Sequence, residues 1–203
     1  MHNKLMMGAA AVLAAGAAAS NASADVVVVE FAEPGFFEAD VTLTDVAGGV
    51  EVSIDINDAV GPGDLFGFFF DIGDECLLPG FNASGANIQA QLFSANNVLK
   101  VGQNSNNLNG DGRAKFDGGV QFGSSGAGGA SLVTTTSFVL SSSLGDVDVS
   151  DFLGQRLGLR VQGTSNAEGS LKLVSLVSVP EPGVGLAGTA LLGGLALRRR
   201  RRA

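Results

Sequence analysis

Strict alternation between apolar and polar residues in two neighbouring stretches constrains the fold of this 203-residue chain more than any other feature. In the first stretch, 37–44, apolar residues at every odd position alternate with Glu38, Asp40, Thr42 and Thr44. The second stretch, 50–57, alternates in the same way from Val50 onward. A period of two places apolar side chains on one face of a strand and polar ones on the other. Turn residues at 45–49 separate the stretches, so we expect a β-hairpin.

Short apolar segments separated by Gly, Asn, Asp and Ser continue along the chain and contain no long amphipathic helix. They predict strands at 26–31, 65–72, 88–93, 98–101, 120–122, 132–140, 157–161 and 171–177, with a turn at 96–97. A helical turn is expected near 149–153, and the Gly-rich stretches 102–112 and 118–131 are expected to be loops. This pattern predicts an all-β fold, a single antiparallel β-sandwich of jelly-roll-like type over residues 25–177.

The composition excludes several classes of enzyme. The chain has one His, one Cys, no Trp and no Tyr, and the His is His2, next to the N-terminus. Ser-His-Asp and Cys-His catalysis and His-ligated zinc sites therefore have no residues to use beyond that point. A glycosidase carboxylate pair would lack the aromatic platforms on which a sugar stacks. We expect a protein that is not an enzyme and has no catalytic residues.

The N-terminal segment, 1–24, has the three parts of a secretory signal peptide. Lys4 supplies a positive charge, an uninterrupted apolar stretch runs from Leu5 to Ala19, and Ala22 and Ala24 form an A-x-A cleavage site. This order is typical of a leader that the Sec export machinery recognises and a peptidase removes. The mature chain is expected to begin at Asp25.

The C-terminal segment combines an uncharged stretch, Gly183 to Leu197, with a basic end. A stretch of this kind predicts a short transmembrane helix over 183–197, although about 20 residues usually span a bilayer. The cytoplasmic tail, 198–203, carries the topology-setting residues Arg198, Arg199, Arg200, Arg201 and Arg202. Because basic residues stay inside, everything before the helix is expected outside. A plain single-pass anchor is the alternative interpretation.

Residues 178–182 form the tether before this helix, and they carry the motif Pro180-Glu181-Pro182. A P-E-P motif followed by a Gly/Ala/Leu helix and a terminal Arg cluster resembles the PEP-CTERM sorting signal of bacteria, also called the ice-binding protein C-terminal domain. The resemblance implies recognition by an exosortase-type membrane processing enzyme and cleavage near Pro180, Glu181 and Pro182. It further implies a membrane-anchored precursor that is delivered to the cell envelope or extracellular matrix.

A second resemblance covers Asp151 to Val174. This stretch is similar to the closing hairpin of small PEP-CTERM ectodomains, with matching residues at Arg160, Gln162, Gly169, Ser170 and Lys172. The resemblance implies a β-sandwich and assigns no catalytic role to any residue.

Between the two ends the chain is strongly acidic. Residues 25–181 keep all 20 acidic residues and 6 of the 12 basic ones, so the net charge is 6 − 20 = −14. Such a charge repels phosphate backbones, so nucleic acid is excluded as a partner. Oxygen-rich loops are what Ca²⁺ requires, and Asp55, Asp58 and Asp64 are the leading candidate ligands. Solvated turns are the alternative, and no other cofactor is expected.

Three smaller features remain. Asp71, Asp74 and Glu75 form a second acidic cluster, and 107–112 resembles the first half of an EF-hand loop without its final Glu. Cys76 is expected to be a small buried residue, with an intermolecular disulfide as the alternative. Taken together, the sequence predicts an exported structural or adhesive protein. The alternative is a carbohydrate- or Ca²⁺-dependent module that binds exopolysaccharide.

Overall fold

The two alternating stretches pair as antiparallel strands, β2 (Phe37–Val46) and β3 (Gly49–Ile56). They lie in a computed structural model that describes residues 25–102, 106–108, 115–123, 132–165 and 168–179. Val46 pairs with Gly49, so only residues 47 and 48 form the turn. The predicted hairpin is confirmed, and its turn is tighter than the sequence suggested.

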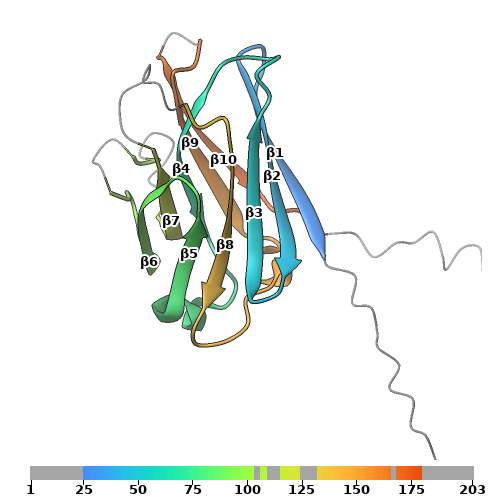
Figure 1. Cartoon of the computed structure of the whole chain (residues 1–203), viewed down its shortest axis with the longest axis vertical. Coiled ribbons are helices and arrows are strands. Elements are labelled where there is room, and N and C mark those ends of the chain that lie inside the picture. The colour runs from blue at the N-terminus through green and yellow to red at the C-terminus, as the bar shows by residue number, and fades with distance from the viewer. Residues whose placement is uncertain (1–24, 103–105, 109–114, 124–131, 166–167, 180–203) are drawn as a thin grey trace, which may run out of the picture.

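The described residues form two sheets of five strands, packed face to face (Figure 1). Sheet A has the order β1-β2-β3-β8-β5 and adds β1 (Val26–Glu33), β8 (Thr135–Ser142) and β5 (Phe81–Gly85). Sheet B consists, in order, of β10 (Ser170–Leu176), β9 (Arg156–Gln162), β4 (Asp64–Phe70), β7 (Phe116–Phe122) and β6 (Ile88–Val98). All neighbouring strands in these sheets run antiparallel. The all-β, antiparallel prediction is therefore confirmed.

The main core lies between the sheets, and most of the largest fully buried side chains of the described residues are phenylalanines. The predicted buried strand is β4, and Phe68, Phe69 and Phe70 are fully buried. The Phe68 ring meets Phe138 of sheet A edge-on at 5.8 Å between centroids. Burial of each such ring stabilises the fold by about 1.5–3 kcal/mol before losses of chain entropy.

Two short 3₁₀ helices connect strands at one end of the sandwich. The predicted turn near 149–153 is confirmed as η2 (Val149–Phe152), where Asp148 and Asp151 form a reciprocal capping box. The second helix, η1 (Glu75–Gly80), and strand β5 were not predicted, because this stretch has no periodic pattern. Among the described residues, no helix is long and apolar enough to cross a membrane.

Strand β6 corrects one prediction, because no turn interrupts it at 96–97. The strand continues from Ile88 to Val98, and its register against β7 shifts between Phe93 and Val98. Asn96 takes a left-handed conformation, φ 48°, inside this irregularity. Its backbone N–H donates to the Asp117 carboxylate at 2.6 Å. Asn tolerates positive φ, so the residues that resembled a turn form a bulge instead.

Strand β7 corrects the first part of another prediction, that 118–131 is loop, while 124–131 lie outside the described residues. Gly118 and Gly119 lie inside β7 and are buried. A Cβ on Gly118 would stand 2.2 Å from the Phe70 ring, and one on Gly119 would stand 2.4 Å from Val101. These glycines serve close packing on both faces of sheet B rather than chain flexibility.

The first and last strands are edge strands that lie beside each other, and the two ends of the folded region meet at one end of the sandwich (Figure 1). The Asp45 N–H donates to the Asp25 carbonyl, and the Val149 N–H donates to the Asp45 carboxylate. The Gly154 N–H donates to the Val177 carbonyl at 2.9 Å. Asp25 and Val177 are thus linked through η2 and the residues that follow it.

Candidate functional site

An acidic surface depression of about 430 Å³ lies at the end of β2 and β3 that is far from Asp25. Its lining comes from the start of β2, the end of β3 and the turn that follows, namely Glu38, Ala39, Asp40, Asp55, Ile56, Asn57, Asp58 and Ala59. Asp45 follows Glu38 by seven positions along β2, which corresponds to about 23 Å of extended strand. The depression therefore lies at the opposite end of the sandwich from Asp25 and Val177.

Asn57 builds the turn beside this depression. Its backbone N–H donates to the Glu38 carbonyl at 2.9 Å, and its side-chain amide donates to the Glu38 carboxylate at 3.1 Å. The Asn57 side-chain oxygen in turn accepts from the Ala59 N–H at 3.2 Å. This arrangement holds the exposed Asp58 beside the ends of β2 and β3.

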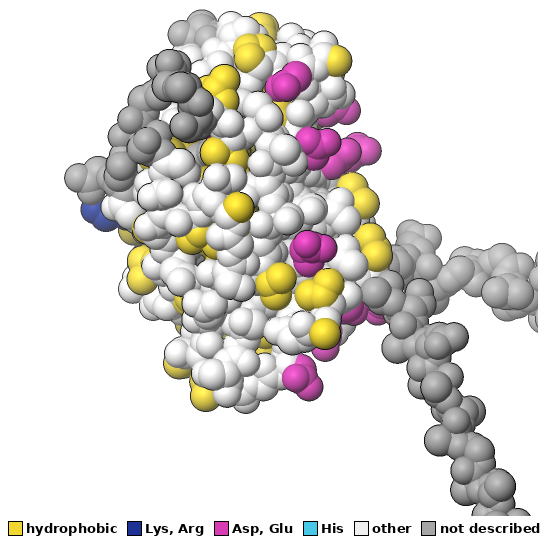
Figure 2. Space-filling view, in the orientation of Figure 1, with side chains coloured by type: hydrophobic (Ala, Val, Ile, Leu, Met, Phe, Trp, Pro, Cys, Tyr) yellow, Lys and Arg dark blue, Asp and Glu magenta, His cyan; other side chains and the backbone are white. Residues whose placement is uncertain are grey.

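The register of sheet A aligns three carboxylates across three strands. Glu30 of β1 pairs with Asp40 of β2, and Asp40 pairs with Asp55 of β3. Like charges directly opposite each other on a sheet are destabilising. The five strands of sheet A contain no Lys or Arg to compensate. In Figure 2 acidic side chains gather over the side of β1, β2 and β3, while the visible basic atoms lie at the opposite edge. A hard cation or a basic partner suits this surface chemically.

The structure brings two of the three predicted calcium ligands together. Asp55 and Asp58 both line the depression, whereas Asp64 opens β4 in sheet B and is buried. The Asp64 carboxylate accepts from the Val133 N–H and from the Gln162 amide, each at 2.9 Å. Asp64 therefore fastens β4 to neighbouring segments. Among the described residues, no three acidic, Cys or His side chains form a group that could hold a metal ion.

Other sequence-predicted residues fall outside the described residues or differ from expectation. The cleavage residues Ala22 and Ala24, the motif Pro180–Pro182 and the arginines 198–202 lie outside the described residues. Cys76 is exposed rather than buried, because Leu77 and Leu78 take the buried positions of η1. In the EF-hand-like stretch, Asn107 accepts from the Lys172 ammonium at 3.2 Å and Leu108 is buried, while 109–112 lie outside the described residues.

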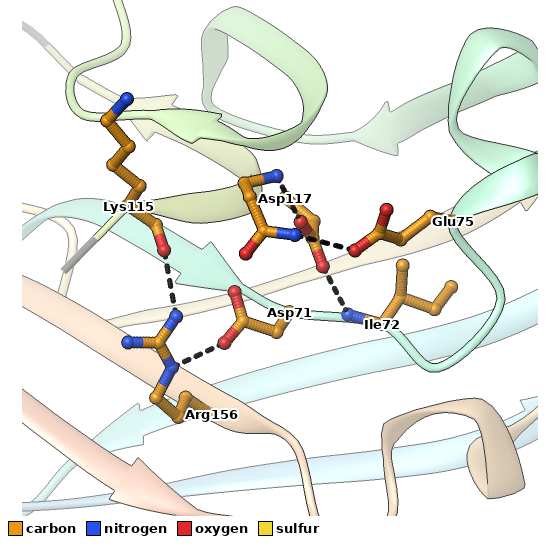
Figure 3. A network of polar contacts seen from close by, with 7 residues as sticks. Asp71, Ile72, Glu75, Lys115, Asp117 and Arg156 are labelled. Carbon is orange, nitrogen blue, oxygen red and sulfur yellow. Dashed lines mark hydrogen bonds and ion pairs between the residues drawn. The ribbon is translucent and has the colours of Figure 1, made fainter.

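A partly buried polar network lies where β4, β7 and β9 meet (Figure 3). The sequence analysis named Asp71 and Glu75 as part of an acidic cluster but missed the network. The Arg156 guanidinium donates to Asp71 at 2.5 Å and to the Lys115 carbonyl at 2.8 Å, and it stacks over the Phe116 ring. The Asp117 carboxylate accepts from the backbone N–H groups of Ile72 and Asn96. The Asn96 side chain then donates to Glu75.

Asp71 is the unusual member of this network. Burial raises the pKa of the Asp71 carboxyl, and the hydrogen bond and charge of Arg156 oppose that rise, while the Asp117 charge adds to it. One Asp71 oxygen accepts from Arg156, and the other is buried without a hydrogen-bond partner among the described residues. The sequence offered one signal, an acidic residue directly after the fully buried Phe68–Phe70 run. Asp117 uses both oxygens on backbone N–H groups, so the network fastens strands.

The comparisons with known proteins add no relative. No protein-family model matches the chain, and no curated protein or solved structure matches it. The likeness of its two ends to a bacterial sorting system therefore stays a proposal.

Proposed function

We propose that this chain is an exported bacterial protein of the cell envelope or extracellular matrix, sorted through a PEP-CTERM-like signal and with a structural or adhesive role. One observation carries the proposal: a P-E-P motif, a short uncharged stretch and five arginines occur in fixed order in the last 25 residues. The leader-like segment 1–24 gives the same orientation, because Lys4 precedes its apolar stretch.

In this proposal each segment has one task. Residues 1–24 direct Sec-dependent export, 183–197 hold the precursor in the membrane, and 198–203 stay cytoplasmic. The exported part is a jelly-roll-like sandwich. Its winding supports this description, since β3 pairs with β8, β4 pairs with β7, and β5 lies beside β6.

The described strands are compatible with removal of both terminal segments, the one before Asp25 and the one after the P-E-P motif. The first described strand begins at Val26 and the last ends at Leu176, so every strand pairing lies between the two predicted cleavage points. Cleavage after Ala24 and near Pro180 would break none of these pairings. The two ends of the folded region also lie at one end of the sandwich, which suits a domain held to a membrane by either segment.

The motif itself provides the test. Pro180, Glu181 and Pro182 are replaced together by alanine in the native host, with Glu33→Ala as a surface control. We expect the triple variant to accumulate in the membrane fraction with its arginine tail, while the control is processed like the wild type. Equal processing of all three proteins would refute sorting through this motif.

A second candidate function is Ca²⁺-dependent binding to exopolysaccharide. The depression that Asp55 and Asp58 share with Glu38 and Asp40 supports it, although no three acidic side chains among the described residues group closely enough to hold an ion by themselves. The position of the depression, at the opposite end from Asp25 and Val177, would turn it away from the membrane. The test is titration calorimetry with Ca²⁺ on the wild type, the double variant Asp40→Asn/Asp55→Asn and the control Glu51→Gln. Binding that is lost only in the double variant supports this function, and no heat in the wild type refutes it.

A further inference from the structure

β10 is the last described strand before the P-E-P motif in the sequence, and Leu176 at its end is exposed. Val177 is buried, its N–H donates to the Gln155 carbonyl and its carbonyl accepts from the Gly154 N–H, each at 2.9 Å. Only Ser178 and Val179 separate this anchored residue from Pro180. Two extended residues span about 7 Å at most. A protein that grips 180–182 is therefore within contact distance of the sandwich.

The surface at this point is apolar. Val174 and Leu176 point outward from β10 with 48% and 65% of their surface exposed, and Val179 is 61% exposed. We call these three residues the β10 patch. β10 is the edge strand of sheet B and lies beside β1, the edge strand of sheet A, so the patch stands where the two sheets adjoin. Exposed apolar side chains gathered at one place are typical of a surface that another protein covers.

We propose that the β10 patch is a docking surface for the membrane enzyme that processes the tail, so that the enzyme reads the folded domain as well as the P-E-P motif. This inference rests on the proposed function. The short spacer fixes the occupant, since whatever holds 180–182 must meet the patch. An anionic bilayer surface suits the site less well, because the same end carries Asp45, Asp148 and Asp151.

The test measures how fast the full-length precursor loses its tail in the native host, by pulse labelling and intact mass. The variant is Val174→Ser/Leu176→Ser, and the control is Val26→Ser/Val28→Ser, whose residues are 55% and 54% exposed on the neighbouring edge strand. Neither pair belongs to the core, and thermal melting of the released protein checks that each variant folds. We expect processing to slow at least fivefold in the β10 variant and to stay within twofold of wild type in the control.

A second variant separates recognition from simple crowding. Eight Gly/Ser residues inserted between Val179 and Pro180 move the patch away from the motif. We expect processing to slow, because the enzyme can no longer hold both together. Faster processing would mean that the folded domain only obstructs the enzyme, which would overturn the proposal.

The remaining outcomes separate this inference from the function on which it rests. Processing of the wild type with equal rates in all variants overturns the docking surface and leaves the proposed function standing. A wild type that keeps its tail overturns both. Dimers of the released protein that the β10 variant abolishes would assign the patch to a second copy. Loss of binding to phosphatidylglycerol vesicles would assign it to lipid, and either result would overturn enzyme docking.

Discussion

The outer faces of the two sheets differ, although both sheets enclose the same core. The outer face of sheet A, which we call the bare face, presents acidic, hydroxyl and valine side chains, such as Asp40, Thr42 and Val28. The outer face of sheet B, which we call the covered face, lies under residues 98–102 and 106–108. A second apolar cluster forms there from Phe69, Val98, Val101, Leu108 and Phe116.

Glycines make the covered face possible. A Cβ on Gly158 would lie 2.3 Å from Leu108, and one on Gly67 would lie 2.2 Å from the buried amide of Asn106. No described segment forms a matching layer over sheet A, and like charges lie opposite one another there instead. Stability therefore depends on both faces of sheet B but only on the inner face of sheet A. The outer face of sheet A is left available for solvent and partners.

The largest effect is expected on the covered face. Phe69→Ala removes the ring that packs at 5.8 Å from Phe116, and it should lower the free energy of unfolding by about 3–5 kcal/mol. Val28→Ala on the bare face should change it by no more than about 0.5 kcal/mol. Urea denaturation of the chain from Asp25 to Val179 measures both. Similar losses would refute the difference between the faces.

A smaller loss of stability is expected at Gly119, where Val101 approaches sheet B closely. Gly119→Ala places a methyl group 2.4 Å from Val101 and 3.1 Å from Phe69, so it should cost about 1–3 kcal/mol through overpacking. Ser53→Ala on β3 of the bare face serves as the control and should be nearly neutral. A Gly119→Ala variant with unchanged stability would show that Val101 is loosely packed against sheet B.

The polar network around Asp71 predicts that the stability of the fold depends on pH. Burial raises the pKa of Asp71, so the folded state holds this proton more tightly than the unfolded chain. The resulting stability is present at low pH and is lost as pH rises from the ordinary value of 3.8 through the raised pKa. In that window the wild type should lose stability more steeply than Asp71→Asn. Burial also raises the pKa of Asp151, which both proteins share, so it cancels in the difference. Parallel slopes would contradict the prediction.

The smallest effect is expected on the bare face. Asp40→Asn relieves repulsion from Glu30 and Asp55, which lie opposite it on both sides, and should stabilise by about 0.2–1 kcal/mol at low salt. High salt should remove the gain by screening. Glu51→Gln is the matched control, because Thr44 and Val139 lie opposite it. A gain that persists in high salt would rule out a charge effect.

Local patterns predicted the hairpin, the buried Phe68–Phe70 strand and η2, because alternation, apolar runs and capping residues act over a few positions. They missed β5, a short strand in F-N-A-S-G without alternation that becomes a strand through pairing with β8. They also placed Asp64 with Asp55 and Asp58, although β4 crosses to the other sheet. Arg156, the partner of Asp71, lies 85 positions away, and Asp117 lies 45 positions from Ile72, so no local pattern reports these contacts.

The central claim is that a folded domain travels between two removable address segments. The most direct measurement is the intact mass of the protein recovered from the envelope or medium of its native host. The account predicts a chain that begins at Asp25 and ends near Pro182. A full-length chain in the cytosol, with its leader and all five terminal arginines still attached, would contradict it.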